Sequence, residues 1–122
     1  MSMLLPFVMM LSSPVLLPGG EDGVDKELTC EVGPVDREYG GSAFSIYSCD
    51  DGQSVVAVAK PKSRAFPFYF IVSPYGDQVR LYGEGDGNDD ATHAAFADLN
   101  RFRPADVAAL VAATKALAKA DP

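Results

Sequence analysis

The sequence predicts an α+β fold, in which an antiparallel sheet of about five strands is followed by two C-terminal helices packed on one face. Residues 27–82 contain short segments in which apolar and polar side chains alternate, as they do along a half-buried strand. Glycine, proline and aspartate separate these segments and indicate turns. From residue 92 onward, apolar side chains recur with the spacing of a helix. A run of strands before a run of helices is typical of this class.

The segment 66–82, FPFYFIVSPYGDQVRLY, predicts the central hairpin of the sheet. Its first arm is apolar on both faces, which is typical of a strand that is covered on both sides. Residues 73–77 contain Pro74 and Gly76 and predict the turn. In the second arm Val79 and Leu81 alternate with polar residues, which indicates a strand with one face toward the core.

Three further strands are expected before this hairpin, at 27–32, 43–49 and 53–59. Residues 33–42 contain two glycine-rich steps with charged residues between them, and they predict a loop that is long for a hairpin. Asp50-Asp51-Gly52 predicts a tight turn with glycine in last place. A basic loop at 60–65 leads into the central hairpin.

Residues 83–90, GEGDGNDD, predict a loop in which Asp89 or Asp90 caps the first helix. Pro104 suits the first position of a second helix, whose many alanines favour helix formation. We expect the core to contain the apolar residues of these strands and helices, namely Phe44, Ile46, Val56, Val58, Phe68, Phe70, Val79, Leu81, Phe96, Leu99, Leu110, Val111 and Leu117.

The N-terminal segment, residues 1–20, carries no charged side chain and contains the apolar run Met3–Leu11. That run is too short to span a bilayer, so no stable membrane span is expected. We interpret the segment as a secretory signal, followed by a polar linker at 21–26 and a single domain at 27–120. The protein is then periplasmic or secreted. If the segment is instead a strand of the fold, the protein is cytoplasmic.

Cys30 and Cys49 are the two cysteines of the chain. In an exported protein a disulfide between them is the expected state. However, a hairpin symmetric about the expected loop 33–42 pairs Cys30 with Ser45. Cys49 then lies about four residues further along the strand, which is too far for a disulfide. Two buried thiols are the alternative, and no CxxC or Cys–His spacing supports a metal or catalytic role.

The formal net charge of −7 argues against a nucleic-acid partner and favours a cationic protein partner. Lys60, Lys62 and Arg64 form the one basic patch and are candidate binding residues for a carboxylate or phosphate. Tyr75 at the hairpin tip is a further candidate, because exposed tyrosine is typical of contact surfaces. A solvated loop is the alternative for the basic patch, and packing of the turn is the alternative for Tyr75.

The acidic loop 86–90 begins with the alternation of a calcium loop, but Ala91 and Ala97 stand where that pattern needs Gly and a bidentate Glu. No metal or cofactor is therefore expected. His93 is the one histidine of the chain. No nucleophile, base and orienting group can be assembled around it, so no catalytic residue is predicted.

The segment Tyr47–Val55, YSCDDGQSV, resembles the Y-x-C-x-x-G segment of the periplasmic C-type lysozyme inhibitors, in which a strand, a disulfide cysteine and a tight turn recur. The resemblance covers about nine residues and implies an exported, mainly β protein. The inhibitory Ser/Gly-rich loop of that family has no clear counterpart here, and the two expected helices depart from it. No functional residue is therefore carried over.

Together these features predict a small exported, non-catalytic binding or inhibitory module that acts on a protein partner. One alternative is a hydrolase-type enzyme that uses His93 and the acidic loop 86–90, which a deep pocket holding His93 and at least two acidic side chains would favour. The other is a structural subunit that assembles through its C-terminal helix, which an exposed stripe of Val107, Leu110 and Leu117 would favour. The sequence predicts neither the partner nor the oligomeric state.

Overall fold

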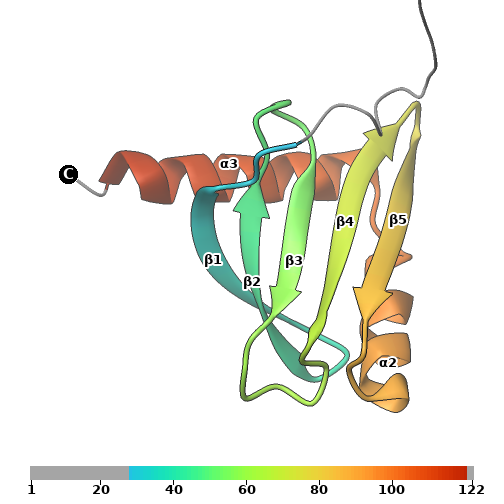
Figure 1. Cartoon of the computed structure of the whole chain (residues 1–122). Coiled ribbons are helices and arrows are strands. Elements are labelled where there is room, and N and C mark those ends of the chain that lie inside the picture. Colours follow the sequence, from blue (N-terminus) through green and yellow to red (C-terminus); the bar gives the residue numbers. More distant parts are fainter. Residues whose placement is uncertain (1–27, 121–122) are drawn as a thin grey trace, which may run out of the picture.

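The structure, a computed structural model, describes residues 28–120. Five antiparallel strands form one sheet in which each strand pairs with its neighbours in sequence (Figure 1). The strands are β1 (Val32–Tyr39), β2 (Ser42–Ser48), β3 (Val55–Ala59), β4 (Phe68–Tyr75) and β5 (Gln78–Gly85). The helices α2 (Asp89–Leu99) and α3 (Pro104–Ala120) follow them. The expected α+β architecture is therefore confirmed.

Both helices lie on the same side of the sheet, behind it in Figure 1. Helix α3 crosses the strands and packs against β1, β2, β3 and β4, whereas α2 packs against β1. The core lies between this side of the sheet and the helices, and its largest members include Phe44, Ile46, Phe70, Val72, Leu99 and Val107. The predicted signal segment 1–20 and linker 21–26 lie outside the described residues.

The first hairpin differs from the expected one. Most of the expected loop 33–42 belongs to β1 and β2, and the turn consists of Gly40 and Gly41 between the paired residues Tyr39 and Ser42. Gly40 has a φ of 59°, and a Cβ at this position would collide with the backbone of Ala94 in α2. The proline and charges that suggested a loop are tolerated because β1 is an edge strand.

Local hydrogen bonds explain two other boundaries. The third strand begins at Val55 rather than residue 53, because Asp51 Oδ1 accepts the backbone N–H groups of Gln53 and Ser54 at 3.0 and 2.9 Å and holds both in the turn. Helix α2 is capped by Asn88, whose side chain accepts the N–H of Ala91, and not by either of the aspartates that follow it. Those two aspartates lie in the first turn of the helix.

The central hairpin is confirmed, but its turn is tighter and its second arm longer than expected. Pro74 is part of β4 and pairs with Val79, so the turn lies at Gly76 and Asp77. Strand β5 continues to Gly85, into the segment that was expected to be a loop. The alternation of apolar residues ends at residue 82, but backbone pairing with β4 continues beyond it.

Four expected core residues are placed differently. Val56 and Val58 lie on the opposite face of β3, and Val55, Ala57 and Ala59 are buried in their place. Phe96 and Leu117 are 43% and 44% exposed. Helix α2 instead turns its small residues toward the core, and α3 extends past β1 at its C-terminal end (Figure 1). Within the described residues, no helix is long and apolar enough to cross a membrane.

Candidate functional site

The side of the sheet opposite the helices is not covered by any element of residues 28–120 (Figure 1). We call it the uncovered face. It presents two apolar and aromatic rows that cross the strands through paired positions. The first row is Tyr47, Val56, Ile71 and Tyr82, and the second includes Val58 and Tyr69. Tyr82 is 53% exposed and the others are half-buried.

This composition is unusual for a sheet face that contacts water, which normally carries polar side chains. The sequence makes the uncovered face apolar because β3 and β4 carry apolar residues on both sides. The expectation that β4 is covered on both sides is wrong for the described residues, since the helices cover only one. A contiguous exposed surface of aromatic and aliphatic side chains is characteristic of a binding surface.

A cluster of two tyrosines and a glutamate borders this face on β4 and β5. The hydroxyl groups of Tyr69 and Tyr82 both donate to Glu84 Oε1, at 3.2 and 2.6 Å. Partial burial, followed by the charge of Glu84 and the hydrogen bond to it, raises the pKa of Tyr69. The hydrogen bond to Glu84, followed by the charge of that carboxylate, raises the pKa of Tyr82.

We expect Glu84→Gln to lower the pKa of both tyrosines toward the ordinary value of about 10. A raised pKa means that the folded state favours the protonated phenol. The hydrogen bonds therefore stabilise the fold fully below the ordinary pKa, and this contribution is lost as pH rises through the raised values. The measurement is an alkaline titration of phenolate absorbance, which no tryptophan obscures in this chain. Asp77→Asn is the control, because it removes a carboxylate at the β4–β5 turn; equal titrations for all three proteins would contradict the cluster.

A pocket of about 410 Å³ opens at one end of the uncovered face. Its walls include Val58 and Tyr69 from the sheet, Phe66 and Pro67 from the loop before β4, and the acidic residues Glu84 and Asp86. The N–H of Asp86 donates to the carbonyl oxygen of Pro67 at 2.8 Å, which ties the end of β5 to this loop. Phe66 is 45% exposed, so an aromatic residue is accessible in a pocket that two acidic residues also line.

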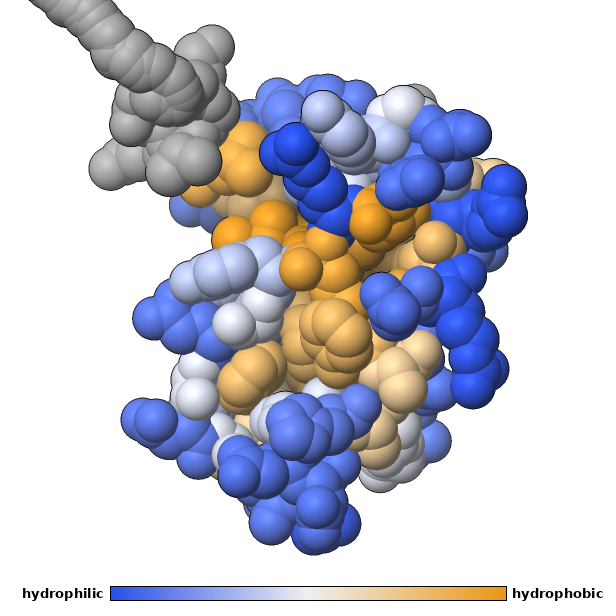
Figure 2. Space-filling model, turned by 90° about the vertical axis from the view of Figure 1, so that its right-hand side faces the viewer, coloured by the Kyte–Doolittle hydropathy of each residue, from blue (hydrophilic) through white to orange (hydrophobic). Residues whose placement is uncertain are grey.

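The apolar surface continues around the edge strand β5. Figure 2 views the molecule from the side on which β5 and α2 lie, and apolar side chains occupy the middle of this side between hydrophilic borders. The apolar residues near the rim of the core include Phe68, Val79, Leu81 and Phe102, which are partly buried, and Phe96, which is exposed. No strand of the described residues pairs with the outer edge of β5.

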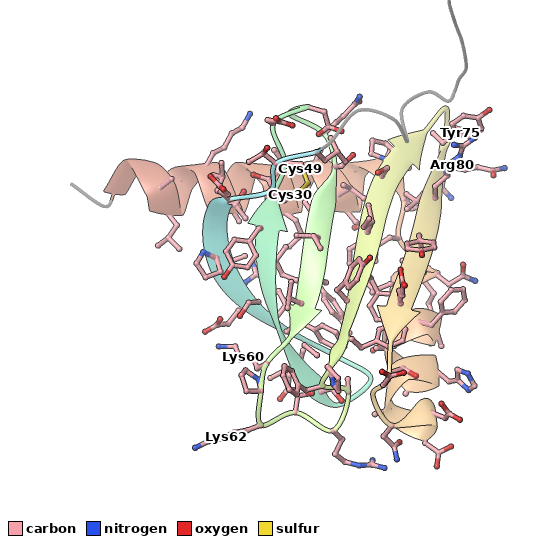
Figure 3. All side chains as sticks on the ribbon, viewed as in Figure 1. Cys30, Cys49, Lys60, Lys62, Tyr75 and Arg80 are labelled. Carbon is pink, nitrogen blue, oxygen red and sulfur yellow. A yellow bond between two sulfur atoms is a disulfide. The ribbon has the colours of Figure 1, made fainter. Side chains whose placement is uncertain are left out.

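The predicted binding residues do not form one site. Tyr75 lies at one end of β4, and Lys60 and Lys62 lie near the other end of the sheet (Figure 3). The length of β4 separates these two ends by roughly 23 Å. The guanidinium of Arg80 lies 3.8 Å from the centre of the Tyr75 ring, an interaction that involves no residue of the basic loop.

The basic patch is also divided among different partners. Lys60 Nζ forms an ion pair with Asp36 at 2.8 Å, on the neighbouring edge of the sheet. Arg64 donates to the Oδ1 atom of Asn88 at 3.1 Å and so braces the N-terminus of α2. Lys62 is exposed at the end of its loop (Figure 3). These positions do not converge on a common anion.

His93 is exposed on α2 and does not line the pocket at Glu84. The loop before α2 uses Asn88 to cap the helix, as described above. Among residues 28–120, no group of three or more His, Cys, Asp and Glu residues is arranged to hold a metal ion. In the stripe of α3, Val107 and Leu110 are buried, and Leu117 is exposed.

Cys30 and Cys49 form a disulfide. The observed register of the first hairpin removes the geometric difficulty, because Val32 pairs with Ser48 and places the two cysteines side by side (Figure 3). The N–H of Asp50 donates to the carbonyl oxygen of Thr29 at 2.8 Å beside the disulfide.

The turn that follows the disulfide is held by Asp51. Burial would raise the pKa of this carboxyl, but hydrogen bonds from the Ser54 hydroxyl and from the N–H groups of Gln53 and Ser54 outweigh it, so the pKa lies below its usual range. The Ser54 hydroxyl also lies 2.7 Å from that of Ser73 in β4, which links the turn to the central hairpin.

Comparison of the chain with protein-family models, curated proteins and solved structures finds no match. The site is therefore defined by its own geometry. Sequence reasoning missed Glu84, Tyr82 and Ile71. The signal that could have found them is that β4 is apolar on both faces and that β5 carries a tyrosine. If the helices cover only one face of the sheet, these residues form an apolar surface on the other face.

Proposed function

We propose that the chain is a small exported, non-catalytic binding or inhibitory module that acts on a protein partner through its uncovered face. The observation that carries this proposal is the row Tyr47, Val56, Ile71 and Tyr82, which crosses four strands with no described element over it. Tyrosine is enriched at protein interfaces because its ring contributes a large apolar area and its hydroxyl retains a polar partner.

Two properties support an exported protein. The Cys30–Cys49 disulfide is favoured in an oxidising compartment. The composition of residues 1–20, which lie outside the described part, is typical of a secretory signal. The partner is cationic in this proposal, because a net charge of −7 attracts positively charged surfaces over long range.

The two alternatives have less support. The enzyme alternative needs a pocket that holds His93, and the pocket on the uncovered face is lined by Asp86 of the acidic loop but not by His93. The structural-subunit alternative needs an exposed stripe on α3, and two of its three residues are buried in the chain's own core. Leu117 is the exposed member of that stripe and serves below as a control position.

In the test, the full chain is used as bait to capture proteins from the exported fraction of the native host at low and high salt. The dissociation constant is then measured with the purified partner. The N-terminus of the native protein is read by mass spectrometry in the same fraction. We expect Ile71→Arg to weaken binding by at least about tenfold, because it introduces an unpaired charge at the centre of the interface. Tyr82→Ala, at an exposed position, repeats the test with little risk to folding.

Leu117→Arg is the matched control, because it adds the same charge at an exposed apolar position on α3. Binding that survives Leu117→Arg and is lost in Ile71→Arg supports the uncovered face. The reverse pattern would support assembly through α3. Retention of no protein at either salt concentration would count against the binding module, and an uncleaved N-terminus on cytoplasmic protein would remove its export.

A further inference from the structure

We propose that the pocket formed by Phe66, Tyr69, Glu84 and Asp86 receives the guanidinium group of an arginine side chain of the protein partner. This inference rests on the proposed function, since it names the chemistry of the partner at one end of the uncovered face. The observation that carries it is a pocket of about 410 Å³ whose lining combines two acidic residues, Glu84 and Asp86, with the exposed ring of Phe66 and the half-buried Tyr69.

Glu84 has the capacity to bind a cation. Its Oε1 atom accepts the hydroxyl groups of Tyr69 and Tyr82, which orient the carboxylate. Its Oε2 atom accepts no hydrogen bond from the side chains and backbone of residues 28–120. An oriented carboxylate with a free oxygen is a strong acceptor for a charged donor, and the planar guanidinium matches it better than an ammonium does.

The aromatic lining favours the same ligand. Phe66 is 45% exposed and borders the pocket together with Tyr69. A guanidinium stacks on such rings, and the aliphatic part of an arginine side chain packs on apolar surface of the kind that Val58 and Pro67 supply. The chain already shows this preference once, because Arg80 lies over the ring of Tyr75 at 3.8 Å.

The basic residues of the loop before β4 form no ion pair with Glu84 or Asp86. Lys60 is paired with Asp36, and Arg64 donates to Asn88. Among the side chains of residues 28–118, neither Glu84 nor Asp86 takes part in an ion pair. The two carboxylates are therefore available to a cation that arrives from outside, and the net charge of the chain favours its approach.

The pocket also indicates the source of the cation. It lies at the end of the uncovered face and is bordered by two of its residues, Val58 and Tyr69. A partner strand or loop on that face therefore places one long side chain in the pocket while its backbone stays outside. A free guanidinium compound offers the same charge but contacts none of the apolar row.

The test is a heteronuclear NMR titration of the full chain with three blocked tripeptides, acetyl-Gly-X-Gly-amide, in which X is arginine, lysine or citrulline. We expect the arginine peptide to shift the amide signals of Phe66, Tyr69, Glu84 and Asp86. The citrulline peptide has the same shape without the charge and is expected to bind about tenfold more weakly, as is usual when a charged hydrogen bond is lost. Free guanidinium chloride at equal concentration tests whether the peptide source matters.

Glu84→Gln is expected to weaken binding of the arginine peptide about tenfold, because it keeps an acceptor for both tyrosines but removes the charge of the carboxylate. Phe66→Ala tests the aromatic contact independently of charge. Asp77→Asn is the matched control, since it removes one carboxylate at the opposite end of the hairpin and is expected to leave binding unchanged. Equal binding of the arginine and citrulline peptides, or full binding by Glu84→Gln, would overturn the inference.

The two proposals fail in different ways. If a captured protein is lost with Ile71→Arg but is retained with Glu84→Gln and Phe66→Ala, the pocket inference fails and the proposed function stands. If the arginine peptide binds no better than free guanidinium and no protein is retained, a protein source for the cation is excluded and the proposed function fails. Loss of the same captured protein in Ile71→Arg and in Glu84→Gln, but not in Asp77→Asn, supports both.

Discussion

Replacement of Phe70 by alanine is expected to lower the free energy of unfolding by about 3–5 kcal/mol. Phe70 is 1% exposed, and its ring centre lies 5.0 Å from that of Phe68 and 5.9 Å from that of Phe44. Large aromatic neighbours held by the sheet do not collapse into the space, so the cavity term adds to the lost burial. The measurement is equilibrium unfolding in urea with the m-value fitted independently.

Phe96→Ala is the matched control for this prediction. It removes the same group from α2, but Phe96 is 43% exposed and contacts Phe70 only at a centroid distance of 6.5 Å. We expect its loss to be less than half of that of Phe70→Ala, because much of its surface already contacts water. Equal losses for the two variants would contradict the placement of Phe70 in the core and of Phe96 at its rim.

The elements whose periodicity is strong were predictable from the sequence. Strand β2 alternates between buried and half-buried residues, and Phe44 and Ile46 are in the core as expected. Helix α3 begins at Pro104. A backbone N–H at the first position of a helix has no partner within the helix, so a proline there costs no hydrogen bond. The N–H of Arg103 is in turn satisfied by Asp106 Oδ2 at 2.8 Å, which closes the start of the helix.

The first hairpin was not predictable because its local sequence and its tertiary role conflict. Gly33-Pro34 and the charges after it are typical of a loop, but an edge strand needs few inward hydrophobic residues. Val35 and Tyr39 supply them here. The close contact between Gly40 and α2, together with a hydrogen bond from the Gly40 N–H to Asp98 Oδ2 at 2.6 Å, fixes the turn from outside the hairpin. Such a contact leaves no signal in the local sequence.

The candidate site was missed for a related reason. Strands β3 and β4 are apolar on both faces, and periodicity alone does not show which face the helices cover. An apolar second face predicts either a second covering layer or a binding surface, and the sequence favoured the first. Ile46 pairs with Ala57 and Ala57 pairs with Phe70, so these three residues share the face that the helices cover. Their neighbours in the strands, Val56, Val58 and Ile71, therefore lie on the opposite face.

Removal of the disulfide by the double substitution Cys30→Ser and Cys49→Ser is expected to lower the free energy of unfolding by about 3 kcal/mol. The bond joins residues that are 19 positions apart, and its loss restores the freedom of that loop in the unfolded chain. For a domain of this size the melting temperature should fall by roughly 12–24 °C. Thermal unfolding followed by circular dichroism measures the change.

Two controls separate the bond from the side chains that form it. The unsubstituted chain treated with a reductant should unfold at the same temperature as the double serine variant, because both lack the cross-link. A thiol-alkylating reagent without reductant should leave the unsubstituted chain unchanged, since residues 28–120 contain no free cysteine. If the reduced and oxidised chains instead unfold at the same temperature, the cross-link does not remove freedom from the unfolded chain as expected here. The disulfide would then contribute nothing to stability.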